Sequence, residues 1–308
     1  MKSGEFELAV VGGGIAALTA AWHAAQNGCR VVLITGTDLA GGLVTNIGAL
    51  DGFPAVAPTA GLALAERLIE QAKALGVEVA PVRVEGLSAA GGRFVLQSAA
   101  GQWRAAKVIA ATGARLKDLE VAGAETFRDK GVLQCAWCNA GLFRGRQVVV
   151  VGAGDAAFQE AAHLARMEAR LTMVVRGEQV RARRALVEQV AANEAIVFLW
   201  SSEVTAVTGA GHVTGVSVRD VQTGVTSSIA CDAVFPYIGL RPNSAWLDDL
   251  VERDPAGAVI TDAQCTTRTP GLFAIGALRH GYGGRLTHAM GEATSAAIAV
   301  AVELEGRR

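Results

Sequence analysis

The sequence predicts an α/β protein built from two Rossmann-like dinucleotide-binding domains. Two stretches carry this prediction, G-G-G-I-A-A at residues 12–17 and G-A-G-D-A-A at residues 152–157, because each follows a short apolar run and precedes an alanine-rich one. The length agrees, since 308 residues correspond to two domains at about 150 residues each. The 37 glycines, against a usual share of about 7%, are typical of many tight strand-to-helix turns.

The overall composition argues against several classes of partner. A net charge of −1 gives no reason to expect binding to nucleic acid or to an anionic membrane surface. No uninterrupted apolar run approaches the length of about 18 residues that a spanning helix needs. The start M-K-S-G-E-F-E leads straight into a predicted strand and does not resemble a signal peptide. We therefore expect a cytoplasmic protein with no nucleic-acid or membrane partner.

The first glycine turn has the features of a phosphate-binding turn. A strand predicted over residues 6–11 ends at Gly12, which permits a tight turn, and Gly14 lets a pyrophosphate approach the backbone. Ala17 is small enough for the following helix to pack on the strand. The start of that helix supplies free N–H groups for phosphate oxygens. The alternative is a βαβ turn that binds no ligand.

The segment after this turn departs from the usual dinucleotide pattern. The second strand, predicted over residues 30–34, ends without the acidic residue that often binds ribose hydroxyls, and Asp38 comes slightly late. Residues 39–58 are predicted as a loop, and residues 59–75 as an amphipathic helix with Thr59 as its N-cap.

The remaining regular structure is predicted from apolar runs and alternation. A strand that ends near Ala111 leads into Thr112 and Gly113, where we expect the chain to pass close to a cofactor or to leave a domain. The predicted strands are 77–84, 93–97, 103–111, 196–199, 204–207, 213–218, 233–238 and 272–276. A final alanine-rich helix is predicted over residues 287–304.

The second glycine turn repeats the first. A strand predicted over residues 148–151 leads into Gly152, Gly154, Asp155 and Ala157, and a helix follows. The same physical argument applies: a tight turn, close approach of a phosphate and close packing of the helix. We therefore predict a second dinucleotide here.

The next strand, over residues 171–175, suggests which nucleotide it is. It is followed by Arg176 and Arg181, and arginines at this place suit the 2′-phosphate of NADPH. Glu178 would instead suit the free hydroxyls of NADH. The alternative for the arginines is an ordinary solvated helix face.

Cys135 and Cys138 form a C-x-x-C pair just ahead of the second glycine turn. If the pair begins a helix, the helix terminus lowers a thiol pKa, and the thiolate is the species that exchanges disulfides. The alternatives are half of a structural zinc site or two buried thiols. Zinc needs four ligands, and neither a second C-x-x-C nor paired histidines occur in the sequence. We predict a redox pair and no metal.

In these motifs the chain resembles the low-molecular-weight thioredoxin reductases, within the FAD-dependent pyridine nucleotide–disulfide oxidoreductases. The resemblance covers nearly the whole length, and the order and spacing of the motifs are more specific than any one of them. Besides the two glycine turns, the motifs are A-T-G-A at 111–114, C-A-W-C-N at 135–139, I-G-L-R-P-N at 238–243 and T-P-G-L-F-A-I-G at 269–276.

The resemblance implies a domain organisation and an electron path. Residues 1–115 and 242–308 would form an FAD-binding domain, and an NAD(P)-binding domain over residues 116–241, which carries the cysteines, would be inserted into it. Electrons would pass from NAD(P)H to FAD, then to the cysteine pair, then to an external disulfide. Cys138 would face the flavin and Cys135 would attack the external disulfide. NADPH is the expected nicotinamide, with NADH or none as alternatives.

The resemblance also implies further site residues and partners. Gly276, Arg285 and Leu286 occupy positions at which the family holds FAD. The partner would be a thioredoxin-like protein or a small-molecule dithiol or disulfide. The protein would be a homodimer whose domains rotate to present nicotinamide and dithiol to the flavin in turn.

Several residues depart from the family pattern. The aspartate that usually follows the second cysteine and handles a proton is Asn139, which cannot titrate. The basic motif H-R-R-x-x-x-R keeps only Arg176 and Arg181 of its basic positions. A usual Gly-Asp pair ends in Ala277, and a usual Arg-Gln pair ends in Leu286. Most of these changes remove polar groups expected beside the flavin or the NADPH phosphate.

These departures leave alternative functions open. One is a flavin-dependent dithiol oxidase that forms a disulfide in a small molecule, with oxygen as acceptor. Another is a nicotinamide-independent or degenerate flavin-binding homologue. His280 or His288 could supply the missing acid or base, since histidine titrates near neutral pH. Ordinary surface or capping roles are the alternative for both histidines.

Overall fold

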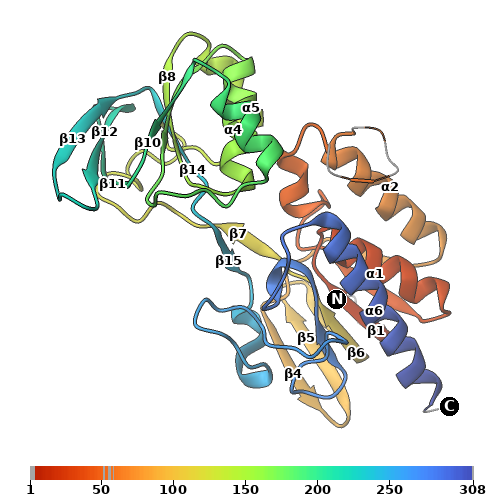
Figure 1. Ribbon diagram of the computed structural model, residues 1–308. Helices are drawn as coiled ribbons and strands as arrows, with labels where there is room; N and C mark the ends of the chain where they lie inside the picture. Colours follow the sequence, from red (N-terminus) through yellow and green to blue (C-terminus); the bar gives the residue numbers. More distant parts are fainter. Residues whose placement is uncertain (1–3, 51–52, 55–56, 58, 307–308) are drawn as a thin grey trace. The chain divides into compact units, whose positions relative to one another are not determined.

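The computed structural model (Figure 1) describes residues 4–50, 53–54, 57 and 59–306. The chain forms two compact units, which we call unit 1 (Met1–Arg115 with Arg241–Arg308) and unit 2 (Leu116–Leu240). The chain leaves unit 1 through strand β7 (Ala114–Leu116) and returns through β15 (Leu240–Pro242). These two short strands pair with each other.

Unit 1 is built on a seven-stranded sheet of order β3-β2-β1-β6-β5-β4, with β16 pairing to β6 as well. The pairings among β1, β2, β3, β6 and β16 are parallel, whereas β4, β5 and β6 pair antiparallel. The strands are β1 (Gly4–Val11), β2 (Val31–Ile34), β3 (Glu78–Ala80), β4 (Gly86–Ala90), β5 (Arg93–Ser98), β6 (Gly101–Ala110) and β16 (Leu272–Ala274).

The register of this sheet positions the first glycine turn. Val11 at the end of β1 pairs with Ala110 at the end of β6. Both strands are parallel, so the turns that follow them, at Gly12 and Ala111, lie side by side. The central strands are buried along their apolar ends, as expected for parallel strands covered on both faces.

Helices of unit 1 cover the sheet and share one core with it. That core contains buried residues of α1, α2 and α6. The second core of the unit contains buried residues of all seven strands of the sheet and of η3. Helices α1 and α6 contact each other (Figure 1), and both contribute fully buried alanines to the shared core, among them Ala17, Ala20, Ala293 and Ala297. The helical elements are α1 (Ile15–Gln26), η1 (Gly42–Asn46), α2 (Gly61–Ala74), η3 (Ala245–Leu250), η4 (Gly276–Leu278) and α6 (Leu286–Glu305).

Unit 2 contains a four-stranded parallel sheet of order β10-β9-β8-β14 and a three-stranded antiparallel sheet of order β11-β12-β13. Its strands are β8 (Gln147–Val151), β9 (Arg170–Val174), β10 (Ile196–Leu199), β11 (Ser202–Gly209), β12 (Val213–Asp220), β13 (Thr226–Ala230) and β14 (Ala233–Pro236). Its helical elements are α3 (Ala136–Asn139), η2 (Ala140–Phe143), α4 (Asp155–Arg166) and α5 (Arg184–Ala191).

The structure corrects several details of the predicted elements. Thr59 is not an N-cap, because α2 begins at Gly61 with Ala60 as its N-cap and without a side-chain cap. The strand predicted over 77–84 is ordered as β3 only over Glu78–Ala80. The predicted loop 39–58 contains the short helix η1, and its residues 51–52, 55–56 and 58 lie outside the described residues. The exposed strand β13 has no apolar pattern, so it was missed.

Candidate functional site

Gly12 in the first turn is required by the close approach of two strand ends. Its φ of +140° is one that residues with a side chain rarely adopt, and a Cβ placed there would lie 2.2 Å from the carbonyl oxygen of Ala111. Its N–H donates to the carbonyl of Ile34 at 2.8 Å, which ties the turn to the end of β2. The glycine is therefore a requirement of the fold.

Gly14, two residues further on, has a different environment. Nothing lies closer than 3.9 Å to the position of a Cβ there, and its backbone is extended. It is the N-cap of α1, and the first turn of that helix has neither a side-chain cap nor an acidic residue. Helix N–H groups without a side-chain partner, beside open space, fit the phosphate of a nucleotide. Ala17 is fully buried where α1 packs on the sheet, as predicted.

The residues at the end of β6 support the same turn from the other side. The side-chain hydroxyl of Thr112 donates to the carbonyl of Asn243 at 2.8 Å and accepts from the indole N–H of Trp246 at 3.2 Å. Gly113 has a φ of +62°, and its carbonyl accepts from the N–H of Asn243 at 2.9 Å. The Thr112 side chain is thus engaged in tying two segments of unit 1 together.

A buried carboxylate that the sequence reasoning missed lies beside Gly276. The N–H of Gly276 donates to Glu292 Oε2 of α6 at 2.6 Å. The other oxygen of Glu292 pairs with Arg279 and lies 3.1 Å from His288 Nε2. Ala277, next to Gly276, stands where the resemblance leads us to expect an aspartate. A lone glutamate in the alanine-rich run of 289–301 was the signal that could have indicated this buried ion pair.

Two other residues predicted near this place begin the last helix. Arg285 is the N-cap residue of α6, and its carbonyl accepts from the hydroxyl of Tyr282 at 2.9 Å. Leu286 is the first residue of α6 and packs against the core of unit 1. Leu286 therefore contributes an apolar contact at a position where a glutamine would offer hydrogen bonds.

The second glycine turn, in unit 2, repeats the geometry of the first. Gly152 has a φ of +145°, and a Cβ there would lie 2.4 Å from the carbonyl oxygen of Tyr237. Gly154, the N-cap of α4, has nothing within 4 Å of a Cβ position. Ala157, in the first turn of α4, is fully buried. The turn therefore leaves the same open approach to helix N–H groups and fits a second nucleotide.

The loop after β9 folds back onto this turn. The N–H of Arg181 donates to the carbonyl of Ala153 at 2.8 Å. The carboxylate of Asp155 accepts from the N–H of Arg183 at 2.7 Å and pairs with its guanidinium at 3.1 Å. The side chains of Arg176 and Arg181 are exposed in this loop and precede α5, so they are not part of a helix face. Exposed guanidinium groups in a loop that is hydrogen-bonded to a glycine turn suit a phosphate.

Cys135 and Cys138 form a disulfide. Cys135 is the N-cap of the short helix α3, and its sulfur accepts from the N–H of Cys138 at 3.1 Å. Asn139 follows, and its side-chain amide donates to the carbonyl of Cys135 at 2.8 Å. The predicted placement of the pair at a helix start is confirmed. Asn139 stabilises this turn as a hydrogen-bond donor, a role that an ionised aspartate cannot fill.

Two side chains that sequence reasoning missed bond the backbone between the cysteines. The N–H of Ala136 donates to the hydroxyl oxygen of Tyr237 at 3.1 Å. The N–H of Trp137 donates to Glu160 Oε2 of α4 at 3.2 Å. The Trp137 indole, which is exposed, stacks on the ring of His163 with a centroid distance of 4.2 Å. Each N–H from residue 136 to residue 138 therefore has an acceptor of its own.

The ionisable groups of this cluster differ in charge at neutral pH. Burial raises the pKa of Glu160 to about 7, although the hydrogen bond from Trp137 opposes the shift. Burial, and secondly the charge of Glu160, raises the pKa of Tyr237, so the phenol stays neutral. Burial, and secondly Arg166, lowers the pKa of His163, so its ring is mostly neutral as well. Glu160 is the member of this cluster that changes charge near neutrality.

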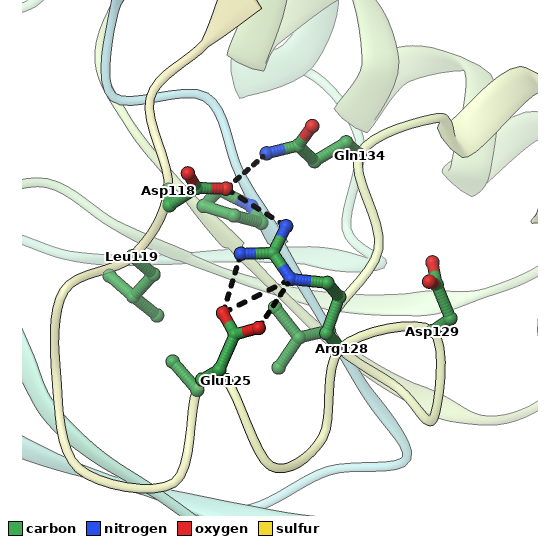
Figure 2. Close-up of a pocket in the computed structure, with 9 residues that line it drawn as sticks. Asp118, Leu119, Glu125, Arg128, Asp129 and Gln134 are labelled. Carbon is green, nitrogen blue, oxygen red and sulfur yellow. Dashed lines mark hydrogen bonds and ion pairs between the residues drawn. The ribbon is translucent and has the colours of Figure 1, made fainter.

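A hollow elsewhere in unit 2 is occupied by its own side chains. Figure 2 shows Arg128 between Asp118 and Glu125, with ion pairs of 3.0 Å and 2.6 Å. The amide of Gln134 also donates to Asp118, at 3.3 Å. Because these polar groups satisfy one another, the hollow offers little to a ligand. Within the described residues, no group of three or more potential metal-binding side chains occurs, and no helix is long and apolar enough to cross a membrane.

A C-x-x-C disulfide in the same unit as one glycine turn, with a second such turn in the other unit, fits the class of nucleotide-dependent disulfide oxidoreductases. The family model of pyridine nucleotide-disulphide oxidoreductases matches residues 6–295. The chain belongs to this family.

Individual relatives narrow the class. The chain is 36% identical to a thioredoxin reductase of Treponema pallidum over 89% of both proteins. It is 33% identical to a bifunctional thioredoxin reductase/thioredoxin of Mycobacterium leprae, of which it spans 60%. Among solved structures, thioredoxin reductases of Lactococcus lactis and T. acidophilum superpose with TM-scores of 0.93 and 0.92 at 30% and 27% identity, and each match covers at least 97% of both chains. The chain is a flavoprotein disulfide oxidoreductase of the thioredoxin reductase type.

Proposed function

We propose that the protein transfers electrons from NADPH through FAD to the Cys135–Cys138 disulfide and then to a disulfide of a thioredoxin-like protein. Enzymes of the thioredoxin reductase type bind FAD and NADPH. The observation that carries the proposal is the Cys135–Cys138 disulfide, ahead of a glycine turn with an uncapped helix start in the same unit. Unit 1 would hold FAD and unit 2 would hold the nicotinamide nucleotide.

The residues present fit both cofactors. We assign Gly12, Gly14 and Ala17 to the FAD turn, because Gly14 leaves open space beside free helix N–H groups. Thr112 and Gly113, together with Gly276, Arg285 and Leu286, complete the proposed FAD positions of unit 1. Bound FAD would supply hydride acceptance from the nicotinamide and electron delivery to a disulfide.

In unit 2, we assign Gly152, Gly154, Asp155 and Ala157 to the nicotinamide nucleotide. The exposed guanidinium groups of Arg176 and Arg181 support a preference for NADPH. Glu178 gives weaker support for NADH, because its carboxylate already accepts a hydrogen bond from the side-chain amide of Gln222 at 2.5 Å. Replacing both arginines with alanine is expected to raise the KM for NADPH at least tenfold and to leave the KM for NADH within twofold. Equal changes for the two nucleotides would contradict the assignment.

The cysteines would divide the work between them. Cys135 would attack the external disulfide, because the N–H of Cys138 donates to its sulfur and so favours the thiolate at that atom. Cys138 would receive electrons and would resolve the mixed disulfide by attacking Cys135. A Cys138→Ser variant should therefore accumulate a mixed disulfide with thioredoxin, whereas Cys135→Ser should not.

An anaerobic titration of the visible spectrum tests the function. NADPH in near-stoichiometric amount should bleach the flavin band, and oxidised thioredoxin should restore it. Bleaching by a dithiol but not by NADPH, with recovery in air, would refute the reductase direction. Absence of any flavin band after incubation with FAD would refute FAD binding.

The proposal also includes an assembly and a location. We propose a homodimer in the cytoplasm, on the resemblance to the family. Sedimentation equilibrium should give twice the mass of the 31.7 kDa chain. A monomeric mass would contradict the proposed homodimer. Fractionation of the native protein into an oxidising compartment would contradict the proposed cytoplasmic location.

A further inference from the structure

The disulfide turn has an ionisable neighbour that the function above does not use. Glu160 lies on α4, and its carboxylate accepts from the N–H of Trp137. Trp137 lies between the two cysteines, as the second residue of α3. The family position that would titrate, residue 139, holds an asparagine whose amide is bonded to the carbonyl of Cys135. Unit 2 therefore lacks the usual acid but contains another carboxyl group bonded to the same turn.

Glu160 interacts with the backbone N–H of Trp137 and with the phenol of Tyr237. Tyr237 approaches from the chain just after β14 and bonds the adjacent N–H, and Tyr237 and Glu160 interact electrostatically. On α4 itself, His163 lies against the Trp137 ring, with Arg166 one turn further on. From α3, the N–H of Trp137 is hydrogen-bonded to Glu160, and the two cysteines flank that residue in the chain at positions 135 and 138. No cation in these contacts neutralises Glu160, so its charge and that of a nearby thiolate repel each other.

We propose that Glu160 is a positioning residue that takes up a proton when the Cys135–Cys138 disulfide is reduced and returns it when the disulfide forms again. The inference deepens the proposed function and rests on it for the source of the electrons. Glu160 is hydrogen-bonded to the backbone between the cysteines, so it acts through its charge and through the Trp137 N–H. Its partly exposed side chain allows the proton to come from solvent.

The proton and electron balance follows from the charges. Two electrons break the S–S bond of the oxidised site, which carries one negative charge on Glu160. One sulfur takes a proton and becomes a thiol, the other remains a thiolate, and a second proton neutralises Glu160. The site again carries one negative charge. When an external disulfide is reduced, the thiol and carboxyl protons pass to its two leaving thiolates, and the original state returns.

Two physical facts support this exchange. The Glu160 carboxylate accepts from the N–H of Trp137, and the Cys135 sulfur accepts from the next N–H, that of Cys138. A carboxylate and a thiolate on neighbouring N–H groups of one partly buried turn are like charges, so each disfavours the other. Burial already raises the pKa of Glu160 to about 7 beside the uncharged disulfide. A thiolate formed nearby raises it further, so the carboxyl takes up a proton at physiological pH. The two groups therefore titrate as a coupled pair.

The test measures the cysteines of the reduced protein without any nicotinamide or flavin turnover. The protein is reduced with dithiothreitol and desalted without oxygen, and iodoacetamide labelling of Cys135 is followed by mass spectrometry from pH 5.5 to 9.5. Glu160→Gln keeps an oxygen that accepts from the Trp137 N–H, so the turn should stay folded. Glu188→Gln is the matched control, because Glu188 is an exposed carboxylate of α5 that pairs with Arg184 of the same helix.

The expected profiles differ in shape. The wild type and Glu188→Gln should show two inflections, because thiolate and carboxylate share one proton in the middle range. The Glu160→Gln profile should show one inflection, and Cys135 should be labelled about three- to tenfold faster than in the wild type near pH 7.5. A decrease of one unit in the thiol pKa corresponds to about a tenfold larger thiolate fraction. Glu160→Asp should restore two inflections.

A Glu160→Gln profile that superimposes on the wild type would overturn the inference. Because labelling needs only the reduced cysteines, this result is independent of whether NADPH or thioredoxin is the true substrate. A failed flavin titration with biphasic labelling would instead overturn the proposed function and leave the role of Glu160 standing.

Discussion

The two glycines of the first turn should separate folding from cofactor binding. Gly12→Ala places a Cβ 2.2 Å from the carbonyl oxygen of Ala111 and 2.6 Å from its carbon, at a φ of +140°. The neighbour is backbone at the end of a central strand, so it cannot move aside cheaply. Strained backbone costs about 1–3 kcal/mol and overpacking about 1–3 kcal/mol. We expect a loss of about 2–6 kcal/mol in the free energy of unfolding.

Gly14→Ala makes the opposite change. Its φ of −81° suits alanine, and the nearest atom to the new Cβ is 3.9 Å away. Losing glycine at an N-cap costs about 1 kcal/mol at most. The added methyl instead occupies the space that we assign to a phosphate. FAD affinity should fall at least tenfold, which corresponds to about 1.4 kcal/mol.

The assay uses FAD-free protein in both variants. Urea unfolding gives the free energy of unfolding, and quenching of flavin fluorescence gives the Kd for FAD. Gly28→Ala is a control for positive φ alone, since its φ is +78° and nothing lies within 4 Å of its Cβ position. Wild-type FAD affinity in Gly14→Ala would refute the assignment of the FAD turn. Wild-type stability in Gly12→Ala would refute the steric argument.

Further predictions concern the disulfide turn. Tyr237→Phe leaves the N–H of Ala136 buried without an acceptor, so unfolding should become easier by about 1–3 kcal/mol in urea. Asn139→Asp replaces a donor to the carbonyl of Cys135 with an acceptor, so it should cost about 1 kcal/mol at pH 8 and less at pH 4, where the protonated acid donates again. For Glu160 in the oxidised protein, the folded pKa of about 7 lies above the ordinary 4.5. The stabilisation from the protonated carboxyl is therefore full below pH 4.5 and is lost as the pH rises to 7. In urea unfolding, the free energy of unfolding of Glu160→Gln relative to the wild type should therefore increase by up to about 3 kcal/mol between pH 4.5 and 8.

Each of these predictions has a contradicting outcome. A Tyr237→Phe variant as stable as the wild type would show that the N–H finds another acceptor. An Asn139→Asp penalty that does not shrink at pH 4 would place the cost in packing and not in the lost donor. A stability difference between Glu160→Gln and the wild type that is constant with pH would show that Glu160 titrates normally.

Local sequence was enough to predict the glycine turns and the start of the cysteine helix. Gly12 and Gly152 need a backbone conformation that side chains exclude, and such a requirement is visible in the residue type itself. A C-x-x-C pair likewise sets its own spacing on one turn of chain. The apolar parallel strands β1, β6, β8 and β14 were predicted because burial on both faces leaves a continuous apolar run.

Elements with weak local patterns were not predicted. The strand β13 lies mostly exposed and is held by its pairing with β12, so its polar sequence carries no alternation. The start of α2 at Gly61 follows from the close packing of that glycine, whose Cβ position lies 2.0 Å from the carbonyl oxygen of Val44. A capping threonine two residues earlier could not reveal this long-range contact.

The sequence by itself determined the class of this protein, because two glycine turns and one cysteine pair are local features with fixed spacing. Only the tertiary structure decided which side chains surround them. Glu160 is 22 residues beyond Cys138 in the chain, and Tyr237 is further still, yet both bond the backbone of the cysteine turn. Burial and distance set the charge of Glu160, and neither can be read from a residue's neighbours in sequence.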